Sequence, residues 1–300
     1  MMQFFTSDRF VFPLPDGHNF PGRKYILLRE LLLRDGVLKA EQILPSPPVE
    51  DSDLLRAHDA RYVEKVRTGD LDAAEQRRVG IPWSDILVNR IQATMGGAVK
   101  AMEAALETGL SGQLAGGTHH AHRDFGAGFC LFNDFAIAAL KAIAEGWVKR
   151  VAVIDLDVHQ GDGNSAILAH HPDIFVFSMQ GEGNFPAKRV PSDLDVELAE
   201  GMEDTDYLRI LADHLPAVFD FKPDLVLYQA GVDPLKQDRL GRLALSHAGL
   251  MQRDRLVLSE CRTRGIPVSM AIGGGYAGRI ELSVEAYANT YRVAKELYKF

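Results

Sequence analysis

The sequence is poor in cysteine and has no long uninterrupted apolar run. Only two of its 300 residues are cysteines, Cys130 and Cys261, and neither belongs to a CxxC pair. This argues against a disulfide framework and against a cysteine-type zinc finger. No window reaches the roughly 18 consecutive apolar residues of a membrane span. The N-terminus MMQFFTSDRF lacks the basic and apolar regions of a secretion signal. We therefore expect a cytoplasmic protein with no membrane partner.

Basic residues are fewer than acidic ones. The chain has 33 Lys and Arg against 41 Asp and Glu, a formal net charge of −8, which argues against direct binding to nucleic acid. Hydrophobic residues make up 46% and charged residues 25%, as in ordinary globular proteins. No internal repeat, low-complexity tail or long Gly/Ser linker divides the chain. We predict a single domain over residues 1–300, large enough to enclose a water-excluded site; the sequence leaves its oligomeric state open.

Short apolar runs rich in β-branched residues alternate with longer segments of helical spacing. The predicted strands are Gln3–Phe5, Gly112–Ala115, Val151–Asp155, Ile174–Ser178, Leu225–Gln229 and Val268–Ile272. The predicted helices are Tyr25–Arg34, Asp85–Glu107, Phe135–Glu145, Tyr207–Phe219, His247–Arg264 (with Ser246 as N-cap) and Ser283–Tyr298. This alternation predicts an α/β fold, with helices on both faces of a parallel sheet. Continuous apolar runs such as VAVI indicate strands that are covered on both faces.

Polar clusters follow four of these strands. GGTHHAH, DLDVHQGDG, QAGVD and GGGY each come directly after a predicted strand. Ligands bind outside the carboxyl ends of the strands in open α/β sheets. We therefore expect the four loops to meet at one edge and to form a functional site there.

The stretch VIDLDVHQGDG runs an apolar strand into several ionisable residues. Asp155, Asp157 and His159 have the spacing i, i+2, i+4, which places side chains on one face of an extended backbone. Because an unpaired buried carboxylate is costly, such a cluster needs a compensating charge. A mixed Asp/His set suits Zn(II) or Fe(II), and Asp233 in QAGVDPL is the candidate third ligand. The alternative is a polar strand end that caps a helix, with Asp233 in a turn.

His119 and His120 stand next to each other in a glycine-flanked loop. They form either a second pair of metal ligands or an acid/base pair. The second role is open to them because histidine titrates near neutrality. Asp155 and Asp162 are candidates to orient one imidazole each, as a buried Asp does in a Ser-His-Asp triad. Nearby His122 has no obvious partner and is interpreted as a surface residue.

Tyr276 follows three consecutive glycines. Its hydroxyl is a candidate hydrogen-bond donor to a developing oxyanion. The alternative is a tyrosine that packs under a glycine turn and has no chemical role.

Four segments together resemble the zinc-dependent histone deacetylase family. They read GGTHHAHRDFGAGFCLFND, VIDLDVHQGDG, YQAGVDPLKQDRLGRLALS and AIGGGYA, and they stand in the family's order and spacing. The DVHQGDG and DRLGRLALS stretches look most like its class IV branch and bacterial relatives. The resemblance covers roughly residues 3–298. It implies a single-domain arginase/deacetylase fold, with a mainly parallel sheet of about eight strands between helices.

The resemblance also implies a role for each matching residue. The zinc ligands would be Asp157, His159 and Asp233, and His120 would be the general base of a dyad with His119. Asp155 and Asp162 would stand beside these two histidines, and Tyr276 would polarise the scissile carbonyl. The walls of a narrow tunnel for the acyl-lysine stem would be Gly128, Phe129 and Phe185. An inner structural K⁺ would be held by the side chains of Asp155 and Ser178 and by the main-chain carbonyls of Asp157, His159 and Met179.

Two features of the family are not assigned from the sequence. A substrate-gripping Asp on a rim loop is characteristic of some relatives, and Asp85 in GIPWSDIL is not placed in that role. The segment HNFPGRKY resembles the family's N-terminal motif and leaves open whether Arg23 or Lys24 lies at the floor of the site.

Three functions stay open. The first is a zinc-dependent hydrolase that removes an acetyl or longer acyl group from lysine in a protein or peptide. The second is a deacetylase of a small acylated amine such as an acetylated polyamine, for which Glu182 hints at an acidic rim. The third is a module that binds acyl-lysine without turnover. A dinuclear manganese hydrolase on the same fold is weaker, because QAGVDPL offers only Asp233.

Overall fold

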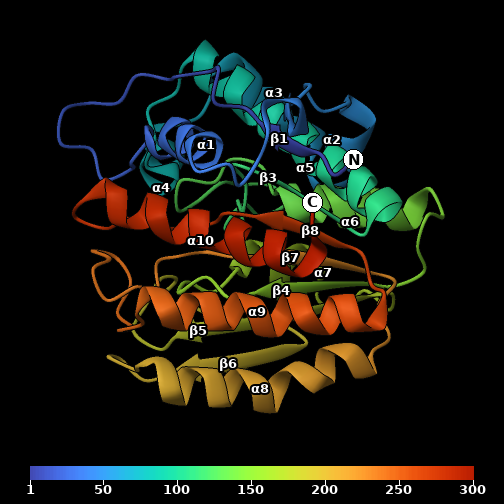
Figure 1. The fold of residues 1–300 in the computed structure, drawn as a ribbon. Helices are drawn as coiled ribbons and strands as arrows, with labels where there is room; N and C mark the ends of the chain where they lie inside the picture. Colours follow the sequence, from blue (N-terminus) through green and yellow to red (C-terminus); the bar gives the residue numbers. More distant parts are fainter.

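One eight-stranded sheet organises the protein, which we describe from a computed structural model covering residues 1–300 (Figure 1). Its strand order is β2-β1-β3-β8-β7-β4-β5-β6, and every neighbouring pair is parallel. The strands are β1 Phe4–Thr6, β2 Ile43–Pro45, β3 Leu110–Gln113, β4 Val151–Asp155, β5 Ile174–Gly181, β6 Leu194–Leu198, β7 Leu225–Gln229 and β8 Val268–Ala271.

Ten α-helices and one 3₁₀ turn connect the strands. They are α1 Lys24–Arg34, η1 Ala40–Gln42, α2 Asp51–Ala57, α3 Ala60–Thr68, α4 Ala73–Val79, α5 Asp85–Thr108, α6 Asp134–Ala144, α7 Asp162–Leu168, α8 Asp204–Asp220, α9 His247–Arg264 and α10 Ile280–Tyr298. Ser246 caps α9 as predicted, because its hydroxyl accepts a hydrogen bond from the Gly249 N–H at 3.0 Å. No helix is both long enough and apolar enough to span a membrane.

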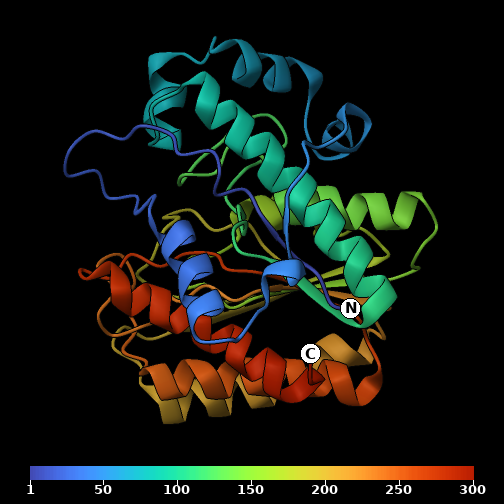
Figure 2. The same cartoon turned by 45° about the horizontal axis from the view of Figure 1, so that its top comes forward.

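Helices cover both faces of the sheet, and each central strand contributes side chains to both. On β4, Ala152 and Ile154 pack into one hydrophobic core, whereas Val151 and Val153 pack into the other. The first core also contains residues of α8, α9 and α10, which lie in a row in Figure 1. The second contains residues of α5 and α6, and Figure 2 shows α5 crossing on the opposite side. The prediction of strands buried on both faces is confirmed.

All six predicted strands and all six predicted helices exist, most with ends shifted by one to three residues. The sequence interpretation omitted the two edge strands β2 and β6 and the helices α2, α3, α4 and α7. The sheet expected to be mainly parallel is entirely parallel.

The four central strands are what position the site. They are β3, β8, β7 and β4, and they are neighbours in that order although they lie far apart in the sequence. Parallel strands end at the same edge, so the loops that follow these four strands emerge side by side. The polar clusters noted in the sequence stand in these loops.

Candidate active site

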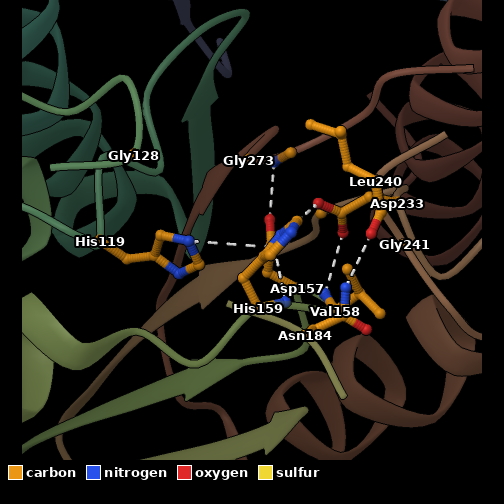
Figure 3. Close-up of polar contacts among 12 residues, drawn as sticks. His119, Gly128, Asp157, Val158, His159, Asn184, Asp233, Leu240, Gly241 and Gly273 are labelled. Carbon is orange, nitrogen blue, oxygen red and sulfur yellow. Dashed lines mark hydrogen bonds and ion pairs between the residues drawn. The ribbon is translucent and has the colours of Figure 1, made fainter. Parts of the chain in front are cut away.

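Three potential metal ligands meet at the ends of β4 and β7. One ligand atom each of Asp157, His159 and Asp233 lies within 4.8 Å of the others, and all three residues are buried. His159 Nδ1 is 3.0 Å from Asp157 Oδ1 and 3.0 Å from Asp233 Oδ2. Figure 3 shows these side chains pointing toward one another, with His119 on the far side of Asp157. The structure therefore brings the three predicted ligands together.

The second oxygen of each carboxylate is fixed by the backbone. Asp157 Oδ2 accepts a hydrogen bond from the Gly274 N–H at 2.6 Å, and Asp233 Oδ1 accepts one from the Val158 N–H at 2.9 Å. These bonds leave Asp157 Oδ1 and Asp233 Oδ2 directed at His159. Two carboxylate oxygens and one imidazole nitrogen form a donor set that fits Zn(II), with Fe(II) as the alternative.

Each histidine of the adjacent pair is bonded to its own carboxylate. His119 Nδ1 is 2.8 Å from Asp155 Oδ2, and His120 Nδ1 is 2.6 Å from Asp162 Oδ1. The two imidazole rings lie 4.1 Å apart between centroids. Because the Nδ1 atoms face the carboxylates, each Nε2 is directed away from its partner, and both residues line one cavity with Asp157 and His159.

The two imidazoles differ in their tendency to bind a proton. Burial lowers the pKa of His119, but attraction to Asp155 and Asp157 outweighs it and raises this pKa to about 9. Burial and repulsion from His119 lower the pKa of His120 to about 4, against the attraction of Asp162. His120 is therefore neutral at pH 7, with its proton on Nδ1 facing Asp162 and a free lone pair on Nε2.

The interpretation of His122 as a surface residue is wrong. Its side chain is only 13% exposed, and its Nε2 lies 3.0 Å from Asp162 Oδ2. The ring also stacks on Phe125, with centroids 4.2 Å apart. Asp162 thus sits between two imidazoles, which hold its pKa well below the usual value even though burial acts in the opposite direction. His122 and Asp162 are 40 positions apart in the sequence, so the segment GGTHHAH by itself does not indicate this contact.

Tyr276 enters the same cavity from the loop after β8. Its hydroxyl makes no hydrogen bond within the protein, although the residue is only 9% exposed. The backbone N–H of Tyr276 donates to Asp238 Oδ2 at 2.5 Å. Asp238 Oδ1 accepts two further backbone bonds, from Leu240 at 2.8 Å and from Gly241 at 2.9 Å. Asp238 therefore ties the tyrosine loop to the loop after β7.

The cavity has a volume of about 350 Å³ and aromatic walls. The predicted tunnel residues Gly128, Phe129 and Phe185 all line it. The Phe185 ring meets the His120 ring edge-on at 4.8 Å between centroids. At Gly128, with φ of +51°, a Cβ would come within 2.5 Å of His120 Cδ2. Only glycine therefore allows this wall to approach the histidine so closely.

Lys24, rather than Arg23, lies at the inner end of the cavity. The Lys24 side chain is 1% exposed, and its Nζ donates to Gly273 O at 3.2 Å and to Tyr287 Oη at 2.9 Å. Burial lowers its pKa to about 8. Arg23 is exposed.

Two other acidic residues considered from the sequence are not among the residues that line the cavity. Asp85 is the exposed first residue of α5, and neither it nor the exposed Glu182 is among the lining residues. Glu182 is nevertheless exposed and directly precedes the lining residue Gly183, so the hint of an acidic rim stays a prediction.

The positions predicted for an inner monovalent cation lie on neighbouring strands. Asp155 of β4 pairs in register with Ser178 of β5, and Met179 follows on β5. Ser178 Oγ is buried and has no hydrogen-bond partner. The carbonyls of the buried residues Asp157 and His159 accept no backbone hydrogen bond. Since buried polar atoms are normally satisfied, this group of oxygens fits a bound cation.

Comparison with known proteins agrees with this geometry. The profile of the histone deacetylase domain family matches residues 18–291. The chain belongs to the histone deacetylase family. It is 31% identical to histone deacetylase 2 of Arabidopsis thaliana, over 86% of this chain and 70% of that protein. An uncharacterized protein of Picosynechococcus sp. is 45% identical over 96% of this chain and 97% of its own length.

The crystal structure of the HDA15 HD domain has the same fold as this histone deacetylase family member. The two superpose with a TM-score of 0.82, over 99% of this chain and 88% of the other, at 22% sequence identity. The arginase/deacetylase fold expected from the sequence is confirmed, and membership of the family makes the chain a deacetylase or amidohydrolase in the broad sense.

Sequence reasoning missed three residues that shape this site. They are Asp238, Asn184 and Arg242. Asp238 acts through backbone hydrogen bonds. The sequence offers only one indication of this, which is that Asp is a common turn-forming residue. Asn184 and Arg242 stand at the mouth of the cavity, on loops that the sequence does not show to be neighbours.

Proposed function

We propose that the protein is a zinc-dependent amidohydrolase that removes an acyl group from the ε-amine of lysine in a protein or peptide. One observation carries the proposal. Asp157 and His159 of the metal cluster, the carboxylate-bonded histidine pair and Tyr276 line a single cavity, and the third cluster residue, Asp233, is buried against His159, with its Oδ2 3.0 Å from His159 Nδ1. Amide hydrolysis needs a site for the acyl oxygen, a base for the attacking water and a donor for the oxyanion.

Asp157, His159 and Asp233 would hold the metal. Zn(II) bound there would act as a Lewis acid on the acyl oxygen and would acidify a water molecule. The protein's own contribution is to keep the donor atoms in place. The backbone N–H groups of Gly274 and Val158 do this, because each holds one oxygen of a ligand carboxylate.

His120 would be the general base. Its Nδ1–H donates to Asp162, which keeps the lone pair on Nε2, the nitrogen that can accept a proton from water. Its low pKa keeps it unprotonated at pH 7. Attraction to Asp155, which bonds its Nδ1, and to Asp157 raises the pKa of His119, so His119 is the imidazole of the pair that favours a proton. The pair can therefore take one proton from water and return one to the departing amine.

Tyr276 would donate its free hydroxyl hydrogen bond to the oxyanion. Burial raises its pKa well above the usual value, so the phenol stays protonated and remains a donor. Loss of one oxyanion donor typically costs about 3–4 kcal/mol in the barrier.

The shape and charge of the cavity favour acyl-lysine over an acylated polyamine. Its aromatic walls suit the apolar stem of a lysine side chain. A polyamine would bring a distal ammonium to the mouth, where the lining includes Arg242 and no carboxylate. A module that binds without turnover would need neither the histidine pair nor the tyrosine hydroxyl.

The inner cation site is proposed to hold K⁺ in a structural role. The side chains of Asp155 and Ser178 would bind it together with the carbonyls of Asp157, His159 and Met179. Asp155 also bonds His119, so a cation there would support the position of the histidine pair.

The function is tested by release of free amine from a matched panel of substrates. The panel is an acetyl-lysine peptide, a myristoyl-lysine peptide and acetylputrescine, each given to zinc-loaded protein. We expect turnover of a lysine peptide, a loss of 10²-fold or more in Tyr276→Phe, and no turnover in His120→Ala with zinc still bound at one per chain. His214→Ala, a substitution on α8 outside the cavity, is the matched control. Full activity of His120→Ala would remove the proposed base.

A further inference from the structure

Two loops that form one side of the cavity mouth are tied together by Asn184. Its Nδ2 donates to Leu240 O at 2.8 Å, and its Oδ1 accepts from the Arg242 N–H at 3.3 Å. Asn184 is itself 6% exposed, so these bonds are shielded from water. The loop after β5 and the loop after β7 therefore form a fixed rim that presents the exposed ring of Phe185 beside the side chain of Arg242.

Arg242 is the only charged residue at the outer end of the cavity. Two other lining residues have acidic or basic side chains of the Lys, Arg, Asp or Glu type. They are Lys24 and Asp157, and both are buried at the inner end. The Arg242 side chain crosses Gly183, where a Cβ would come within 3.0 Å of its Nη1. A side chain at position 183 would thus require the Arg242 side chain to shift slightly.

The Arg242 charge is available to a substrate. Its closest carboxylate belongs to Glu200, 3.8 Å from Nη1, and the two side chains are 53% and 64% exposed. Exposed ion pairs of this kind contribute little and exchange easily. Asp238, the one acid of the neighbouring segment KQDRLGR, is engaged by three backbone N–H groups. Arg242 is thus the one exposed charged side chain among the residues that line the cavity.

We propose that Arg242 selects acyl-lysine segments that carry an acidic residue beside the modified lysine. This rests on the proposed deacylase function and narrows its substrate class. Once the lysine stem fills the cavity, the flanking backbone of the substrate must cross the rim. An Asp or Glu on that segment then meets the guanidinium, whereas a Lys or Arg there is repelled. Arg242 contacts the flanking segment and not the reacting atoms, so it affects substrate binding.

The test compares acetyl-lysine peptides that differ only at the positions flanking the modified residue, which are Asp, Ala or Lys. The quantity measured is the ratio of kcat/KM between the Asp and Lys peptides, at low salt and at high salt. An exposed charge pair gives a factor of about 1.4 to 5 per contact, and the Asp-to-Lys ratio combines one attraction with one repulsion. We expect a ratio of at least about threefold in the wild type, carried by KM, that shrinks as salt screens the charges.

Three variants complete the test. Arg242→Glu should invert the ratio, Arg242→Lys should keep its direction, and Arg209→Glu, a charge reversal on α8 outside the cavity, should leave it unchanged. Because each ratio compares two peptides with the same variant, a partial loss of folded protein lowers both kcat/KM values equally and does not change the ratio. Equal turnover of all peptides, or a ratio that survives in Arg242→Glu, overturns the selectivity and leaves the hydrolase intact. Absence of turnover with every peptide refutes the proposed function itself, and the selectivity that rests on it.

Discussion

Replacing Asp238 with asparagine removes one hydrogen-bond acceptor and keeps the other. Asp238 Oδ1, which accepts from Leu240 and Gly241, is retained as the amide oxygen. Oδ2, which accepts from the Tyr276 N–H at 2.5 Å, becomes an NH₂ group. Two donors then face each other at the base of the tyrosine loop, while the turn at Gly241 keeps its bonds. The substitution therefore acts on the position of Tyr276 and spares the neighbouring loop.

The size of the effect has an upper bound. A hydrogen bond to a charged group contributes about 1.5–3 kcal/mol, and relief of the donor pair requires the Tyr276 backbone to shift. Complete loss of the tyrosine hydroxyl costs about 3–4 kcal/mol in the barrier, or 10²- to 10³-fold in kcat. We expect Asp238→Asn to lower kcat by about 10- to 100-fold, with zinc content unchanged and little change in KM.

The assay is steady-state deacylation of an acetyl-lysine peptide by the wild type, Asp238→Asn, Tyr276→Phe and the double variant. If Asp238 acts through Tyr276, the double variant has the same kcat as Tyr276→Phe alone. Effects that multiply would show that Asp238 supports catalysis by another route. A kcat for Asp238→Asn within twofold of the wild type would refute the reasoning outright.

Two further predictions concern groups away from the reacting atoms. His58 accepts a hydrogen bond from the Asn133 N–H on Nε2, and burial lowers its pKa to about 4. This folded-state pKa lies below the unfolded value near 6.5. The contribution of His58 to the free energy of unfolding is therefore complete above pH 6.5 and falls by up to about 3 kcal/mol toward pH 4. A proton NMR titration that gives His58 a pKa near 6.5 would contradict this. If K⁺ binds at Ser178, the Tm of the wild type should be a few degrees higher in KCl than in tetramethylammonium chloride. Ser178→Ala should abolish this difference. Equal Tm values in the two salts for the wild type would exclude the cation site.

The central part of the fold could be predicted because its strands are buried on both faces. Runs such as VAVI on β4 and LVLY on β7 are apolar at every position, and the start of α9 is marked by its N-cap, Ser246. The edge strand β6 escaped prediction because it pairs on one side only. In its sequence, LDVEL, apolar residues alternate with the acidic residues Asp195 and Glu197, which a half-exposed edge strand tolerates.

The site was predictable where a residue type itself carries the chemistry. Asp157, His159 and Asp233 stand out as ionisable residues after buried strands, and the structure brings them together. Asp238 and Asn184 act by holding backbone groups of distant loops, so their roles depend on contacts that no local pattern encodes. His122 was misjudged for the same reason, because its partner Asp162 is 40 residues away.

The position of β8 in the sheet sets the order in which the molecule can be completed. Val268–Ala271 is the last strand in the chain, yet it lies in the middle, between β3 and β7. Without it, β2-β1-β3 and β7-β4-β5-β6 would have no strand pairing between them. Synthesis runs from the N-terminus, so the histidine pair and the proposed metal ligands are both made before the strand that joins their two halves of the sheet. The sheet, and the cavity that Tyr276 lines, can therefore be completed only after this last strand has been synthesised.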